Sequence, residues 1–139
     1  MVQRFISKRA LRLAAVVVAS GAFALPVAAQ APELAMLAGL QKGAWTLRIR
    51  DAAAGVPQRI CVRDGRELIQ IQHRQPPCRS FVVNDQPDQV TVQYTCAGNG
   101  YGRTSIRREG SGLLQVHSQG IHNGAPFAFS GEARFAGKC

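Results

Sequence analysis

Four cysteines follow an N-terminal segment with the pattern of a secretory signal, and this combination constrains the chain more than any other feature. Residues 1–12 carry four basic side chains, residues 13–25 are apolar or small, and Val27-Ala28-Ala29 supplies the small residues that a signal peptidase requires. We predict a signal peptide at 1–29, although cleavage after Ala31 also fits the pattern. The mature protein is then expected in the periplasm or secreted, where cysteines pair as disulfides.

The apolar part of this signal is short for a membrane anchor. It spans about 13 residues, whereas a helix that crosses a bilayer needs about 20. The rest of the chain contains no apolar run of that length. We therefore expect no transmembrane anchor after signal cleavage.

Removal of the signal lowers the formal net charge. The chain has 17 basic and 8 acidic residues, and the signal takes four of the basic ones, which leaves 13 − 8 = +5. This charge favours anionic surfaces only moderately. Nucleic acid is not an expected partner, because an exported protein does not meet it and the arginines are scattered without an aromatic platform: 59, 63, 66, 74, 79 and 103.

The mature chain has the length of one small domain. Residues 30–42 are interpreted as a linker or partial helix, and 43–139 as a disulfide-stapled β domain. Turn signals recur about every 8 to 12 residues from Ala44 onward, which is typical of an all-β fold. We predict a mostly β protein, a single antiparallel meander of about seven strands that is strongly curled or barrel-like, with one short helix at 65–72. Residues 68–71 of this segment could instead form a strand. The expected strands are 45–50, 58–62, 80–84, 89–96, 101–108, 113–121 and 125–135.

Apolar and polar residues alternate along several of these strands, which gives each of them an apolar and a polar face. Trp45, Leu47 and Ile49 share one face of the first strand. Val90, Val92 and Tyr94 share one face of the fourth, with threonine and glutamine opposite. The last strand carries its three phenylalanines at odd positions: Phe127, Phe129 and Phe135.

The cysteines are predicted to form structural disulfides. Their gaps of 17, 18 and 43 positions do not bring two ligands close in sequence, as zinc sites usually do. No C-x-x-C-H or C-x-x-C motif is present, so neither haem attachment nor redox chemistry is indicated. No cofactor is expected.

Three pairings of four cysteines are possible. A hairpin of 80–84 with 89–96 brings Cys78 and Cys96 together, and pairing of the first strand with the last brings Cys61 near Cys139. This pairing is preferred, although the expected register places Cys78 and Cys96 on opposite faces unless a bulge intervenes. The alternative of Cys61–Cys78 with Cys96–Cys139 stays open.

Catalysis has no positive signal in the sequence. No serine lies in G-x-S-x-G or S-x-x-K, and the acidic residues fall mostly at turns. The histidines, His73, His117 and His122, are expected to be surface or rim residues. We therefore predict that the protein is not an enzyme.

The cysteine framework resembles a bacterial family of secreted proteins catalogued as domain of unknown function 3617. The resemblance covers residues 43–139, and it implies a secreted envelope protein without implying an activity. The family often has a methionine-rich final hairpin, which this chain lacks. The matching segments are Gly43-Ala44-Trp45, Cys61-Val62-x-Asp64, Cys78 with Tyr94-Thr95-Cys96-Ala97-Gly98, and Arg134-Phe135-Ala136-Gly137-Lys138-Cys139.

These features favour a non-catalytic binding or interaction module of the cell envelope, whose partner is a small apolar ligand or an envelope protein. Alternatives are an inhibitor of an envelope hydrolase and a hydrolase without a familiar motif. A curled sheet could hold an apolar ligand, but the same aromatic residues would also fill an ordinary core. The candidate lining comprises Trp45, Phe81, Tyr94, Phe127 and Phe129.

Overall fold

The structure is a computed structural model that describes residues 34–50, 56–74 and 78–139. The expected signal peptide at 1–29 and both of its expected cleavage sites lie outside these residues. Within the described part of the chain, no helix is long and apolar enough to cross a membrane.

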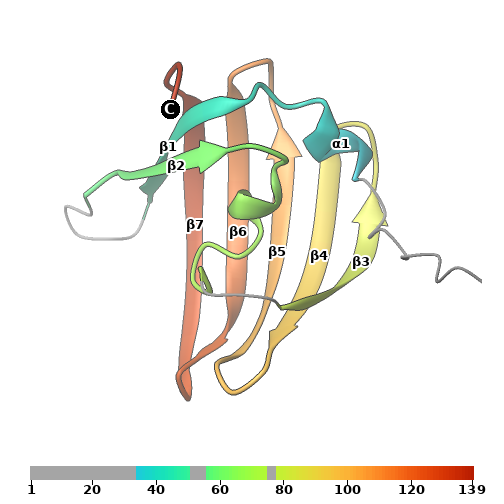
Figure 1. Ribbon diagram of the computed structural model, residues 1–139, viewed down its shortest axis with the longest axis vertical. Helices are drawn as coiled ribbons and strands as arrows, with labels where there is room; N and C mark the ends of the chain where they lie inside the picture. The colour runs from blue at the N-terminus through green and yellow to red at the C-terminus, as the bar shows by residue number, and fades with distance from the viewer. Residues whose placement is uncertain (1–33, 51–55, 75–77) are drawn as a thin grey trace, which may run out of the picture. The chain divides into compact units, whose positions relative to one another are not determined.

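Seven antiparallel strands form one sheet in the order β2-β1-β7-β6-β5-β4-β3, which confirms the predicted fold class (Figure 1). Strands β3 to β7 are a simple meander, and β1 pairs with β7 to carry β2 as an outer strand. The predicted bounds differ from the observed ones by at most two residues. The strands are β1 (Gly43–Ile49), β2 (Gln58–Val62), β3 (Arg79–Asp85), β4 (Gln89–Cys96), β5 (Gly100–Arg108), β6 (Leu113–His122) and β7 (Ala125–Phe135).

The sheet is open, because in the described chain β2 and β3 form its two edges and do not pair with each other. One face is covered by the helix α1 (Ala35–Ala38), the 3₁₀ turn η1 (Arg66–Leu68) and residues 69–74 after it (Figure 1). The strand faces follow the predicted alternation, since Trp45, Val92 and Tyr94 all point into this covered side. The opposite face, called the outer face below, is mostly polar, and the exposed rings of Phe81 and Tyr101 also lie on it.

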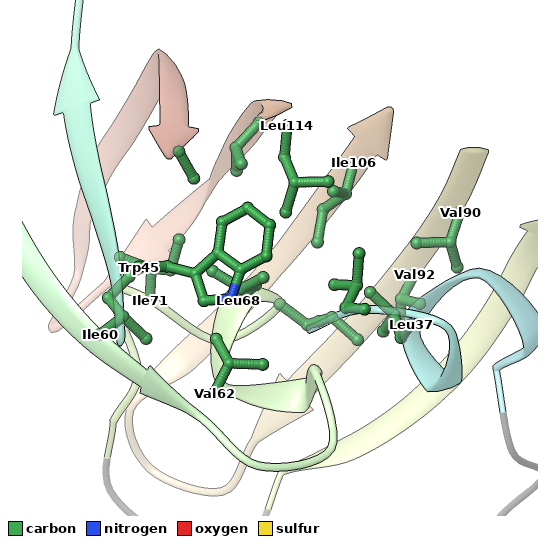
Figure 2. Packing of buried hydrophobic residues seen from close by; sticks show 14 of the residues in the cluster. Leu37, Trp45, Ile60, Val62, Leu68, Ile71, Val90, Val92, Ile106 and Leu114 are labelled. Atoms are coloured by element: carbon green, nitrogen blue, oxygen red, sulfur yellow. The ribbon is translucent and has the colours of Figure 1, made fainter. Parts of the chain in front are cut away.

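Trp45 lies at the centre of the core, fully buried (Figure 2). Leu68 of η1 and Leu37 of α1 pack into the same cluster as the sheet residues around it. Residues 34–40 therefore add to the core, as the burial of Met36 and Leu40 also shows. Residues 30–42 were interpreted as a linker or partial helix, and the described part of this segment contains the short helix α1.

The helix predicted at 65–72 is wrong in extent. Only Arg66–Leu68 forms a 3₁₀ turn, and the residues after it are neither helix nor strand. Ile69, Ile71 and His73 are all buried. Ile69 keeps helical backbone angles, and the His73 amide donates to the carbonyl of Gln70 at 3.0 Å, so an irregular turn follows η1 in place of further helix.

The two disulfides have the pairing that was preferred from the sequence, Cys61–Cys139 and Cys78–Cys96. Their Cα atoms are 5.7 Å and 4.2 Å apart, respectively. The first joins β2 to Cys139, which lies beyond β7, and the second joins Cys78, just before β3, to the last residue of β4.

A β-bulge explains how Cys78 reaches Cys96. The register of β3 on β4 shifts by one position at Val83, which is an extra residue on β3. Beyond this bulge Arg79 pairs with Thr95, so the next position outward places Cys78 opposite Cys96. The expected register paired Phe81 with Val92 and Val83 with Val90. The structure pairs Phe81 with Gln93 and Asp85 with Val90, so the expectation was wrong by one residue on the cysteine side of the bulge and by two on the other side.

Candidate functional site

An arginine-lined pocket of about 490 Å³ opens between β2, η1, residues 70–74 and Cys78. Its size is within the range of small-molecule sites. Both disulfides contribute to its lining, and so does one buried histidine. The lining residues are Arg59, Ile60, Cys61, Arg63, Asp64, Arg66, Glu67, Gln70, His73, Arg74 and Cys78.

Four arginines and two acidic residues line this pocket, so its formal charge is 4 − 2 = +2. The acids are already engaged by neighbouring groups. Glu67 accepts from the guanidinium of Arg63 at 3.1 Å and from the Gly65 amide at 3.2 Å. Asp64 accepts from the Arg66 amide at 2.9 Å. The carboxylates therefore fix the turn at η1 and leave the rest of the pocket positive.

Arg59 and Arg74 donate to neutral oxygens instead of carboxylates. Arg59 donates to the carbonyl of Lys138 at 2.9 Å. Arg74 donates to the side-chain oxygen of Gln58 at 2.8 Å and to the carbonyl of Ile71 at 3.3 Å. A guanidinium has five N–H donors, so both side chains are oriented yet keep donors for a ligand. Neither forms an ion pair among the described residues.

These arginines correct one interpretation of the sequence. Arg59, Arg63, Arg66 and Arg74 were expected to be scattered, but the fold gathers them around one pocket. The available signal was their density, since all four lie between positions 59 and 74. Charge density alone does not show that residues on a strand and in a loop face one space.

His73 lies at the base of the pocket and is 1% exposed, so its assignment as a surface or rim residue was wrong. Its Nε2 lies 3.1 Å from the carbonyl oxygens of Asn99 and of Ile121. Because two carbonyls can only accept, Nε2 carries the proton. Nδ1 then accepts from the Tyr94 hydroxyl at 3.1 Å. These bonds tie the pocket wall to the sheet.

Burial raises the pKa of the Tyr94 phenol, and hydrogen bonds from Ser118 and Thr104 lower it in part. The ring lies over Gly102 of β5, where any Cβ would collide with it. This close approach accounts for one glycine of the segment around 98–102.

The predicted aromatic lining does not gather in one cavity. Trp45 and Tyr94 are packed in the core, and Trp45 meets Phe135 edge-on with ring centres 5.6 Å apart. Phe81 is 71% exposed on the outer face. Phe127 and Phe129 are half-buried and stack at 6.4 Å.

One serine and one histidine form a pair on the outer face. The Ser130 hydroxyl lies 2.8 Å from Nδ1 of His117. No carboxylate in the described ranges bonds the other nitrogen of this ring, so the third group that orients a catalytic base is missing there. The described residues also contain no group of three or more potential metal ligands.

Comparison of the chain with family models, curated proteins and solved structures found no match. The family resemblance drawn from the cysteine framework therefore stays a prediction. Two disulfides suggest an oxidising environment.

Proposed function

We propose that this protein is an exported, non-catalytic binding module of the cell envelope, and that its arginine-lined pocket holds an anionic group of a small ligand. The observation that carries the proposal is the state of Arg59 and Arg74. Both are held in place, both keep free donors, and neither is neutralised by a carboxylate in the described chain. Planar guanidinium groups suit carboxylates and phosphates, which they bind with two parallel hydrogen bonds.

The pocket is also held in shape before any ligand arrives. Cys61 and Cys78 belong to different disulfides: Cys78 is tied to β4 through Cys96, and Cys61 ties β2 to Cys139. His73 fixes the base. Less conformational entropy is then lost on binding, which raises affinity without adding contacts.

Thermal unfolding with inorganic phosphate or citrate, and with glucose as the uncharged control, tests the proposal. A ligand at one hundred times its Kd stabilises by about 2.7 kcal/mol, which raises the Tm of a domain this size by about 10 °C or more. Arg59→Gln and Arg74→Gln should each weaken binding by about tenfold or more, as expected for a lost charge-assisted hydrogen bond. Arg134→Gln is the matched control, because it makes the same charge change at a residue of β7 that does not line the pocket.

Two results would contradict this function. Equal stabilisation by glucose would show that charge is not recognised. Equal weakening in Arg134→Gln would show that the anions respond to net charge and not to the pocket.

The exposed edge strand β3 favours a second candidate, an inhibitor of an envelope hydrolase. Phe81 and Val83 are 71% and 42% exposed on this unpaired edge, and such edges accept strands of other proteins. Inhibition of a periplasmic hydrolase fraction by the native protein, but not by Phe81→Lys, would support this alternative. The periplasmic or secreted location belongs to both candidates, and N-terminal sequencing that begins at Gln30 or Pro32 would support it.

A further inference from the structure

A second hollowed surface lies on the outer face of the sheet and shares no residue with the arginine-lined pocket. It consists of two adjoining hollows of about 300 and 370 Å³. Both are lined by Arg103, Gln119 and Ala128, and together they are called the outer groove here. The described helices pack into the core on the other side and do not cover it.

The strand register explains why the groove exists. Gln93, Arg103, Gln119 and Ala128 pair in turn across β4, β5, β6 and β7, so they form one row on the outer face. The first three have long side chains, and Ala128 has only a methyl group. The short side chain at the end of the row leaves space beside its long neighbours. The neighbouring row deepens one hollow with Ser105, His117 and Ser130.

The chemistry of this surface matches sugar hydroxyls. Glutamine amides and serine hydroxyls can both donate and accept hydrogen bonds, as each sugar hydroxyl does. Tyr101 borders the second hollow and is 50% exposed, which leaves part of its ring for the apolar face of a sugar. An apolar ligand would leave these polar groups without partners.

Charge narrows the ligand further. Arg103 lines both hollows, and none of the residues that line them is acidic. One guanidinium favours a carboxylate on the ligand. The charge of one arginine is too small to bind a nucleic acid, because nucleic acids are bound through many phosphate contacts.

We propose that the outer groove binds a carboxylate-bearing glycan chain, with Arg103 bonding the carboxylate and the glutamine and serine side chains bonding the hydroxyls. Two hollows placed side by side suit consecutive sugar units. This site acts independently of the arginine-lined pocket.

Calorimetric titration with an α-1,4-linked galacturonate trisaccharide tests the proposal, with neutral α-1,4-galactotriose as its uncharged counterpart. The acidic trisaccharide should bind more tightly than the neutral one. Arg103→Gln should lower the affinity for the acidic trisaccharide by about tenfold to a hundredfold and should change the affinity for the neutral one little. Ala128→Phe should weaken both, because it fills the groove; Ala128 is exposed, so the fold should tolerate the change. Arg134→Gln on the same face should bind as the native protein does.

Three results would overturn the glycan site: no binding of the acidic trisaccharide at about 10 mM, a concentration above the millimolar Kd of even a weak complex; equal affinity for the neutral trisaccharide; or binding that survives Ala128→Phe. If Arg59→Gln, and not Arg103→Gln, abolishes binding of the acidic trisaccharide, the trisaccharide binds in the arginine-lined pocket. That result would refute the outer groove as its binding site and would support the proposed function.

Discussion

Replacing Trp45 with alanine should destabilise the protein by about 3–5 kcal/mol, the range measured for large aromatic residues removed from cores. The structure supports the upper half of that range. The side chain is fully buried, and its ring meets Phe135 edge-on at 5.6 Å. Its indole N–H also donates to the carbonyl of Gln41 at 2.9 Å. A loss of about 4 kcal/mol is a large share of the roughly 5–15 kcal/mol that stabilises a typical domain.

Urea unfolding followed by far-UV circular dichroism measures this loss, because the variant has no tryptophan to report by fluorescence. With an m-value of about 2 kcal/mol/M, the midpoint should fall by about 2 M. Trp45→Phe should fall between the native protein and Trp45→Ala, since it keeps most of the packing. Phe81→Ala is the matched control: it removes an exposed aromatic ring and should change stability by no more than about 0.5 kcal/mol.

Two observations would refute this account of the core. The first is an equal midpoint shift in Trp45→Ala and Phe81→Ala, which would mean that burial does not separate the two rings. The second is native fluorescence with the emission maximum of a solvated indole, which would contradict the placement of β1 itself.

Two further predictions concern the disulfides and the buried side chain of Tyr94. Reduction of the disulfides, which close loops of 18 and 78 residues, should cost about 3 and 4.5 kcal/mol and should also weaken phosphate binding; unchanged stability in urea with a reductant would contradict this. Because burial raises the pKa of Tyr94, the stability from its neutral form is present below the unfolded pKa of about 10 and is lost as the pH rises through the folded pKa. Urea midpoints from about pH 8 to 11 should therefore fall less steeply in Tyr94→Phe, and parallel curves would refute the role of Tyr94.

The strands could be predicted because their alternation is local. Val90, Val92 and Tyr94 repeat with a period of two, and polar residues separate them, so the sequence itself states which face is buried. The 3₁₀ turn and the irregular segment after it were harder to predict. Leu68 and Ile69 are adjacent apolar residues, and such a short run fits a helix and a strand equally well. The conformation of this run is determined by its packing against the covered face of the sheet, which the local sequence does not describe.

The sites could not be predicted in the same way, because they depend on register. The row that forms the outer groove joins Gln93 to Ala128 through four strands, and a slip of one residue would move half of it into the core. The bulge at Val83 has the same character: nothing in the local sequence marks it, but without it Cys78 would not face Cys96. The arginine-lined pocket adds a loop to a strand, which is a contact that no periodicity describes.

Different residues of the pocket fix its shape and give it its positive charge, and His73 belongs to the first group. The imidazole is saturated by Tyr94 and by two carbonyl oxygens of the sheet, so it has no nitrogen left for a ligand. The arginines of the pocket differ from His73. Arg59 and Arg74 are exposed, and they donate hydrogen bonds to neutral acceptors. Removing an exposed arginine changes the free energy of unfolding of the protein little. Removing Tyr94 or His73 leaves a buried polar partner without its hydrogen bond, which costs about 1–3 kcal/mol. Charge in the pocket can therefore vary without loss of the fold, and the two arginines can be tested for binding in a protein that remains intact.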